Sequence, residues 1–233
     1  MLNSYVCVDL ETTGLNPKID KVIEIGAVKV VEGKVAETFS TLVNPGRNLE
    51  QRVVDLTGIN DAELARAPYI EMVLPRFIDF VEDLPLLGHN VQFDFSFLKK
   101  AAVNMGMKME CTAVDTLRIA RVHLAGLEKK TLEFLCDYYR ISYQAHRAYE
   151  DAYATHLLYQ KMVEEFYRPE DPVFQPKPLI YQAKKDGPAT SSQKERLYRL
   201  VDRHKLVLPV DIEKMTKSEA SRLTDVLRSK GFV

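Results

Sequence analysis

Two carboxylates, Asp9 and Glu11, stand two residues apart at the end of an apolar, β-branched run. Side chains of a strand alternate between its faces, so these two point the same way, roughly 6.6 Å apart along the chain. Two acids on one face of a buried strand repel each other and lose hydration unless a cation lies between them. Clustered oxygen ligands of this kind are typical of a divalent metal site. Acids exposed at a fraying strand end are the alternative interpretation of this stretch.

Further acids follow at the starts of two expected helices. Asp94 comes after a short apolar strand, and Asp151 lies five residues after His146 in the first turn of a later helix. The helix macrodipole alone favours an acid in a first turn, and a lone histidine is more often a surface or core residue than a catalyst. Asp115, near another strand end, competes as an additional acid. Each residue taken singly therefore leaves a structural role open.

The ordered combination favours catalysis. Four carboxylates can bind two divalent cations roughly 3.5–4 Å apart, which would stabilise the attacking and leaving oxygens of a phosphoryl transfer. A histidine next to them would supply a base for the attacking water. The set as a whole predicts metal-dependent phosphoryl-transfer chemistry.

The elements that must position these residues begin with three strands. The first strand carries Asp9 and Glu11, and strands are expected at 22–31 and 35–43, joined by the turn at 32–34. This arrangement is an antiparallel meander. Alternating helices and short strands follow, with helical spacing or capping signals at 69–82, 93–105, 116–122, 131–139 and 149–167 and short strands at 84–90 and 113–115. The pattern predicts an α/β domain with a mixed sheet over residues 1–167.

The remaining residues divide into two segments. Residues 168–189 are rich in proline and polar residues and are expected to form a linker. Residues 190–233 are expected to form a small helical module, with helices at about 194–204 and 217–229. From Lys184 onward the chain carries 12 Lys+Arg and 7 Asp+Glu, whereas the preceding part carries 20 and 26. The basic module could hold nucleic acid near the site, and a solvated helix pair or a protein-docking element is the alternative.

Composition indicates an ordinary soluble globular protein. Of the 233 residues, 46% are hydrophobic and 28% are charged, which provides for a sizeable core. The three cysteines lack a paired or metal-binding spacing and are expected to be reduced. No secretory signal pattern and no long apolar span is visible, so we expect a cytoplasmic protein without a membrane partner.

Three segments resemble a known family. The sequence DLETTG at 9–14, HNVQFD at 89–94 and HRAYED at 146–151 are similar, in the same order, to the three exonuclease motifs of the DEDDh family. The likeness is greatest to the proofreading exonucleases of bacterial DNA polymerase III, particularly those of the PolC type. Supporting matches are IEIGAV at 23–28, LTGI at 56–59 and VDTL at 114–117. The resemblance covers about residues 4–166.

The resemblance implies an RNase H-like fold with a mixed five-stranded sheet and a 3′→5′ exonuclease that releases nucleoside monophosphates. It implies two Mg²⁺ or Mn²⁺ ions per active site, held by the four acids of the motifs, and assigns the general base to His146. The metal ligands that it implies are Asp9, Glu11, Asp94 and Asp151. The residues that it places against the terminal nucleotide are Thr12, Gly14, Leu15, Asn90 and Phe93. Asp115 is then expected to be a helix cap.

The expected substrate is the 3′ end of a single strand, with DNA favoured, in repair or proofreading. Trimming of RNA by the same chemistry is an alternative, because the contacts to the 2′-OH that would distinguish the sugars cannot be placed from the sequence. A non-catalytic scaffold that recruits a partner through its tail is a third alternative, disfavoured by the intact set of acids. A polymerase or repair protein is an expected partner of the C-terminal module.

Overall fold

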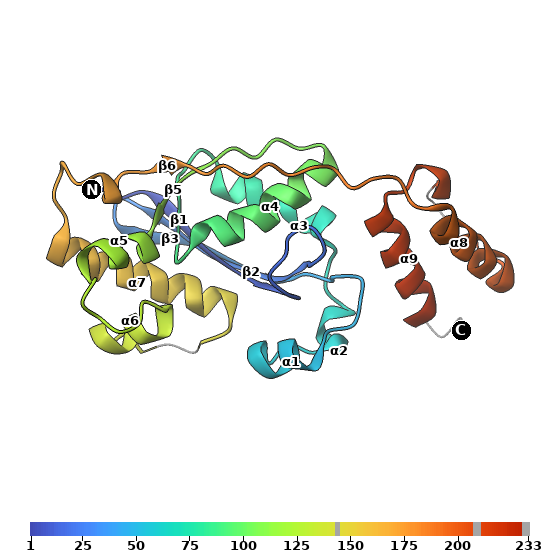
Figure 1. Ribbon diagram of the computed structural model, residues 1–233, viewed down its shortest axis with the longest axis horizontal. Helices are drawn as coiled ribbons and strands as arrows, with labels where there is room; N and C mark the ends of the chain where they lie inside the picture. Colours follow the sequence, from blue (N-terminus) through green and yellow to red (C-terminus); the bar gives the residue numbers. More distant parts are fainter. Residues whose placement is uncertain (143–144, 207–210, 230–233) are drawn as a thin grey trace.

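The computed structural model describes residues 1–142, 145–206 and 211–229, and it has a mixed β-sheet at its centre (Figure 1). Within these residues the sheet has six strands in the order β3-β2-β1-β4-β5-β6. Their bounds are β1 Tyr5–Thr12, β2 Val22–Val31, β3 Lys34–Leu42, β4 Leu86–Gly88, β5 Thr112–Asp115 and β6 Lys177–Pro178. The predicted meander is confirmed, because β1 pairs antiparallel with β2, and β2 with β3. Strands β4 and β5 continue the sheet parallel to β1.

The strand β6 is absent from the five-stranded prediction. It consists of two residues, Lys177 and Pro178, and pairs antiparallel with β5. It belongs to the segment 168–189, which runs extended along the α/β domain (Figure 1). Phe174 of this segment is buried, and Leu179 and Tyr181 pack against the core. The expected linker is therefore attached to the domain along much of its length.

Helices cover both faces of the sheet. Their bounds are α1 Gln51–Thr57, α2 Asp61–Leu64, α3 Ile70–Val81, α4 Val91–Met105, α5 Thr116–His123, α6 Leu132–Tyr139, α7 Ala148–Phe166, α8 Ser191–His204 and α9 Lys217–Ser229, with 3₁₀ turns η1 Pro172–Phe174 and η2 Ile212–Lys214. The expected helices are confirmed to within a few residues. Helix α1 is an addition, since its N-cap residue, Glu50, offers no side-chain cap that would mark its start.

The alternation of β1 assigns its side chains to the two faces. Val6, Val8 and Leu10 lie in the core beneath α3 and α4, whereas Tyr5 and Cys7 lie in the core beneath α5, α6 and α7. Asp9 and Glu11 have the same parity as Tyr5 and Cys7, so they point to the α7 side. The sheet thus directs both acids toward a single helix.

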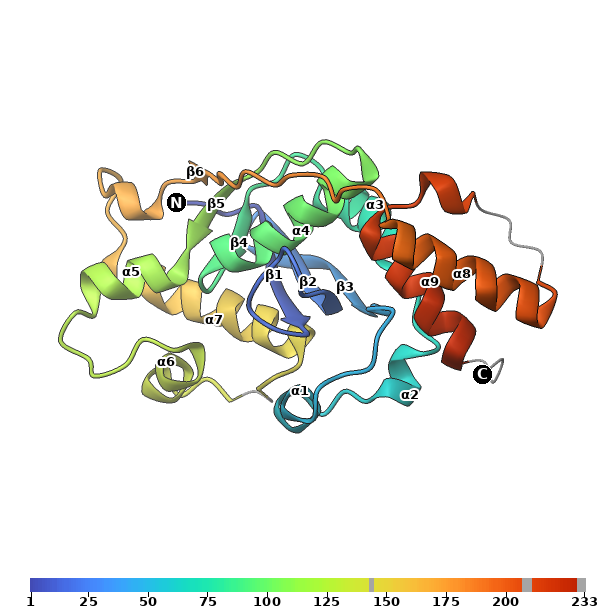
Figure 2. The same ribbon diagram turned by 45° about the vertical axis from the view of Figure 1, so that its right-hand side comes forward.

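The C-terminal module has its own apolar core and lies against the α/β domain. Leu197 and Leu200 of α8 pack with Ala220 and Leu227 of α9. Helix α9 lies between α8 and the α/β domain in both views (Figures 1 and 2). Among the described residues, no helix is long and apolar enough to cross a membrane.

Candidate active site

The first two acids are placed by the pairing of β1 with β2. Asp9 lies opposite Gly26 and Glu11 lies opposite Glu24 in this antiparallel ladder. Directly opposite residues share a face, so Gly26 and Glu24 also point toward α7. The two acids of the first motif therefore stand beside one glycine and one further carboxylate.

Gly26 lets the start of α7 lie on the sheet. A Cβ atom on Gly26 would come within 2.0 Å of the Ala148 carbonyl carbon and 2.1 Å of the Tyr149 nitrogen. Only glycine allows this approach, because any side chain would overlap backbone atoms. The first turn of α7 carries Asp151, so the contact brings this acid to the pair on β1.

Three carboxylates meet at this point. The side chains of Asp9, Glu11 and Asp151 each offer an oxygen, and these oxygens all lie within 4.8 Å of one another. Asp151 is buried, and its carboxylate accepts a hydrogen bond from the Arg147 backbone N–H at 3.0 Å. The structure thus brings together one acid pair and one distant acid that the sequence separates by 140 residues.

Asp94 lies next to this group rather than within it. It is 3% exposed in the first turn of α4, and its Oδ1 accepts a hydrogen bond from the Leu10 N–H at 3.0 Å. The strands β1 and β4 are parallel, so their carboxyl ends meet at the same edge of the sheet. Asp94 is the nearby charge that raises the pKa of Asp9 most strongly. All four predicted metal ligands therefore lie at one edge of the sheet.

The electrostatics of the group fit a divalent cation. Burial, followed by the charges of Asp94 and Asp151, raises the pKa of Asp9 well above its usual value. Burial likewise raises the pKa of Asp94, and burial with the charges of Asp151 and Glu24 raises that of Glu11 to about 7. No ion pair among the described residues involves Asp9 or Asp94. Clustered carboxylate oxygens are the ligands that Mg²⁺ and Mn²⁺ prefer.

His146 lies just before α7 on the solvent side. Its backbone has φ of 65°, in the left-handed region, and its residue is exposed. The structure records no hydrogen bond from its ring to a described residue. Its separation from Asp151 is that of the family motif, and its role as general base stays a prediction.

The end of β1 and the loop after it hold the predicted nucleotide contacts Thr12, Gly14 and Leu15. Thr12 Oγ1 donates to the Gly14 carbonyl at 2.7 Å, and Leu15 is 84% exposed despite its apolar side chain. An exposed apolar side chain on an ordered loop next to a polar site suits contact with a base. These positions agree with contact to a substrate, which stays a prediction.

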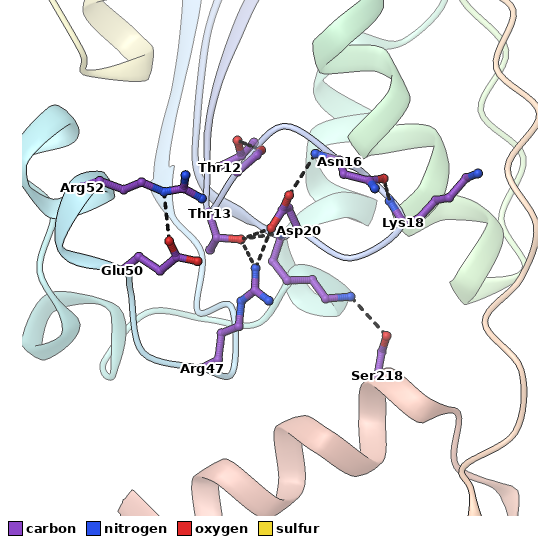
Figure 3. A network of polar contacts seen from close by, with 11 residues as sticks. Thr12, Thr13, Asn16, Lys18, Asp20, Arg47, Glu50, Arg52 and Ser218 are labelled. Carbon is purple, nitrogen blue, oxygen red and sulfur yellow. Dashed lines mark hydrogen bonds and ion pairs between the residues drawn. The ribbon is translucent and has the colours of Figure 1, made fainter.

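A polar network fixes this loop (Figure 3). Asp20 accepts hydrogen bonds from the Asn16 N–H at 2.9 Å and from the Thr13 hydroxyl at 3.3 Å, and it pairs with Arg47 at 2.9 Å. Arg47 also donates to Thr13. The network connects the loop after β1 to the loop after β3. It therefore restrains the loop that carries the predicted nucleotide contacts.

Asn90 and Phe93 flank Asp94 at the start of α4. Asn90 adopts a left-handed backbone with φ of 72°, and its N–H donates to Asp115 at 2.9 Å. Phe93 is half-buried, with its ring centroid 5.0 Å from that of Phe97. Asp115 also accepts from the Leu117 N–H, so the prediction that it caps a helix is confirmed.

Two residues near the site were not predicted from the sequence. Glu24 is 2% exposed on β2, and both of its carboxylate oxygens bind the segment before α7. Arg147 supplies the guanidinium of this contact. The available signal was a charged residue inside the apolar run 22–28, where a buried charge requires a partner.

Comparison with known proteins assigns the chain to a family. The model of the exonuclease family, RNase_T, matches residues 6–159. The chain belongs to the exonuclease family. The matched range contains every predicted catalytic residue. The segment from residue 168 onward lies outside the matched range.

Two relatives illustrate the family. The DNA polymerase III PolC-type protein of Caldanaerobacter subterraneus is 40% identical over 162 residues, which is 69% of this chain and 12% of the relative. The DNA polymerase III subunit epsilon of Aquifex aeolicus is 37% identical over 166 residues, which is 70% of this chain and 82% of the relative. The exonuclease chain therefore spans about an eighth of the PolC-type relative and most of the epsilon relative.

Solved structures confirm the RNase H-like fold of this exonuclease. Exonuclease X, in complex with 5′ overhanging duplex DNA, has a TM-score of 0.57 at 25% identity over 71% of this chain and 95% of that one. The nuclease domain of 3′hExo, a DEDDh family member bound to rAMP, has a TM-score of 0.64 at 16% identity over 77% and 98% of the two chains. The second likeness concerns the fold alone.

Proposed function

We propose that the protein is a metal-dependent 3′→5′ exonuclease that releases nucleoside 5′-monophosphates from single-stranded DNA ends. The observation that carries this proposal is the convergence of Asp9, Glu11 and Asp151 within 4.8 Å beside the buried Asp94. Exonuclease-family membership supports the same reaction. The names of the relatives, DNA polymerase III PolC-type and subunit epsilon, favour DNA and a proofreading or repair role.

The four acids would hold two Mg²⁺ or Mn²⁺ ions. Two such ions, when bound, stabilise the negative charge on the attacking and leaving oxygens of an in-line displacement at phosphorus. His146, exposed at the edge of the site, would accept the proton of the attacking water. His146 and Asp151 both lie in the segment 146–151, so this segment would carry both a metal ligand and the proton acceptor.

The substrate would be gripped without base-edge recognition. The loop with Thr12, Gly14 and Leu15 and the start of α4 with Asn90 and Phe93 offer backbone groups, one exposed leucine and one phenylalanine. Backbone and stacking contacts tolerate any base, as a nuclease that removes successive nucleotides requires. We expect these residues to contribute to KM more than to the chemical step.

A comparison of matched oligonucleotides tests the proposal. A 5′-labelled single-stranded DNA should yield a ladder that shortens from the 3′ end, with nucleoside 5′-monophosphates as products, and matched RNA should be cut more slowly. A ladder that shortens from the 5′ end would overturn the polarity. Faster cleavage of RNA than of DNA would replace the DNA substrate with the RNA-trimming alternative.

The C-terminal module is fixed next to the nucleotide-binding loop. Lys21, at the end of this loop, donates to Ser218 of α9 at 3.1 Å, and Arg222 of α9 pairs with Glu71 of α3 at 2.6 Å. Asp186 accepts hydrogen bonds from Lys100 at 2.6 Å and also from Ser218. A module anchored in this way would lie beside the path of a strand that leaves the active site.

A cavity of about 630 Å³ lies between α9 and the α/β domain. Its lining includes four carboxylates and six cationic side chains, namely Lys18, Lys21, Arg47, Lys100, Lys217 and Arg222. Among the described residues, Lys18, Lys21 and Lys217 form no ion pair, and of these three Lys21 is engaged by Ser218. We propose that Lys18 and Lys217 contact phosphates of the single strand upstream of its 3′ end. A polymerase or repair partner of the module stays a prediction.

The salt dependence of DNA binding tests the role of the two lysines. Replacing both in K18Q/K217Q should make the plot of log affinity against log salt less steep by up to about 1.4, since each phosphate contact to a single strand contributes about 0.7. The control K34Q/K161Q removes the same charge at the far end of the sheet and of α7. Equal slopes for wild type and K18Q/K217Q would exclude this contact.

A further inference from the structure

The carboxylate of Glu24 lies next to the predicted metal ligands, but both of its oxygens accept hydrogen bonds from other protein groups. Its Oε1 accepts a hydrogen bond from Arg147 Nη2 at 2.9 Å. Its Oε2 accepts from Arg147 Nε at 3.3 Å and from the Ala148 backbone N–H at 3.1 Å. Both oxygens thus accept hydrogen bonds from the start of α7, and the carboxylate stands outside the group formed by Asp9, Glu11 and Asp151 although it lies opposite Glu11.

The contact fixes the chain at the first residue of α7. The Ala148 N–H is one of the amides at a helix start that lack a partner inside the helix, and Glu24 supplies that partner. Arg147 is the residue before the helix, and it is bound to Glu24 through its side chain and to Asp151 through its backbone. Its N–H donates to the Asp151 carboxylate at 3.0 Å, and its carbonyl accepts from the Asp151 N–H at 2.9 Å. Arg147 therefore joins Glu24 directly to a predicted metal ligand.

The same segment carries His146, immediately before Arg147. The left-handed backbone of His146 is uncommon for a residue other than glycine, and such conformations persist where the surroundings determine them. Glu24 binds Arg147 and Ala148, the two residues that follow His146. Gly26, two residues after Glu24 on β2, allows α7 to touch the strand. Strand β2 thus sets how closely α7 approaches the sheet and where its first residue is held.

We propose that Glu24 and Arg147 are a positioning pair for the active site, an inference that rests on the proposed exonuclease function. The pair holds His146 and Asp151 in the arrangement that hydrolysis requires, without touching the substrate or a metal ion itself. Loss of a group that orients metal ligands typically lowers metal affinity or activity by about 10- to 100-fold.

The variants R147M and E24Q remove the pair from either side. We expect each to lower kcat about 10- to 100-fold while KM for the oligonucleotide changes little, because the substrate-binding loop is untouched. The double variant should be no slower than the slower single variant, since both act through one contact. The control K161M/E164Q removes an exposed ion pair of 3.1 Å from the same helix and should keep wild-type kcat.

Hydrogen exchange of the metal-free protein provides a readout that does not depend on activity. In R147M the Asp151 amide should exchange faster than in wild type, while the Leu158 amide in the middle of α7 should be unchanged. Equal acceleration of both amides would show general destabilisation and overturn the positioning role, as would unchanged exchange with unchanged kcat. An inactive wild type would refute the proposed exonuclease function, and the exchange rates would still decide the role of the pair.

Discussion

Asp9 lies directly opposite Gly26 in the antiparallel pair of β1 and β2, and Gly26 is the point at which α7 touches the sheet. A predicted metal ligand and the glycine that lets the helix approach are therefore neighbours across the ladder. This relationship explains how a carboxylate near the start of the chain meets Asp151. It also makes the position of Asp151 sensitive to a single methyl group on residue 26.

The first prediction concerns this glycine. G26A places a methyl group 2.0 Å from the Ala148 carbonyl carbon, so α7 must move away from the strand. We expect a loss of about 1–3 kcal/mol in the free energy of unfolding and a reduced kcat, because overpacking forces backbone shifts. Chemical denaturation and single-turnover hydrolysis measure the two effects. The control G126A adds a methyl group with nothing within 4 Å. Wild-type activity in G26A would contradict the account of this contact.

The second prediction concerns His146, the predicted general base. H146A should lower kcat by about 10²–10⁴-fold, the range for loss of a general base. The ring has no hydrogen-bond partner among the described residues, so the melting temperature and the affinity for Mn²⁺ should stay near their wild-type values. Calorimetric titration with Mn²⁺ checks metal binding. Unchanged turnover would remove His146 from this role.

The third prediction concerns stability in the absence of metal. Burial and the neighbouring acids raise the pKa of Glu11 from 4.5 to about 7, so the folded state holds this proton more tightly than the unfolded chain. The stabilising contribution is complete below about pH 4.5 and is lost as the pH rises through about 7. In EDTA the melting temperature of wild type minus that of E11Q should therefore decrease as the pH rises from about 4.5 to about 7.

Metal should counteract this loss. A divalent cation binds the deprotonated acids, so the rise in melting temperature on adding Mn²⁺ should be larger at the upper end of the range than at the lower end. Thermal melts of wild type and E11Q, each with EDTA and with Mn²⁺, measure both effects. A melting temperature in EDTA that rises with pH relative to E11Q would contradict the electrostatic description.

The fourth prediction concerns the attachment of the C-terminal module. D186A removes the acceptor of Lys100, a buried lysine, and of Ser218. Leaving Lys100 with only the Lys184 carbonyl should cost about 1–3 kcal/mol and loosen the segment. Limited proteolysis between residues 168 and 190 should be faster than in wild type and in the exposed control D202A. An unchanged cleavage rate would show that other contacts hold the module.

Most of the sheet and the helices could be predicted because their apolar residues follow clear periods. Helix α3, for example, has apolar residues at helical spacing, and its observed bounds are within one residue of the expected ones. Helix α1 and strand β6 could not be predicted in this way. The first has seven residues and no side-chain cap, and the second has two residues and depends on pairing with β5.

The candidate site was predictable in its acids but not in its supporting contacts. Asp9, Glu11, Asp94 and Asp151 are marked by motif spacing, and the structure brings them to one edge of the sheet. The role of Glu24 depends on tertiary register, because only the pairing of β1 with β2 places it opposite Glu11. The attachment of α9 depends on the Arg222–Glu71 ion pair and the Lys21–Ser218 hydrogen bond, which join residues more than 100 positions apart and leave no local pattern.

The metal dependence of hydrolysis decides whether the four acids form a catalytic metal site. A 5′-labelled single-stranded DNA would be incubated with wild type, D9N and the exposed-surface control D79N, each in Mg²⁺, Mn²⁺ or EDTA. We expect a ladder from the 3′ end for wild type and D79N in either metal, and none in EDTA or with D9N. Equal cleavage by D9N and wild type would contradict the role of Asp9 in a catalytic metal site. No cleavage of DNA or RNA by folded, metal-loaded wild type would contradict the exonuclease function and favour a non-catalytic scaffold.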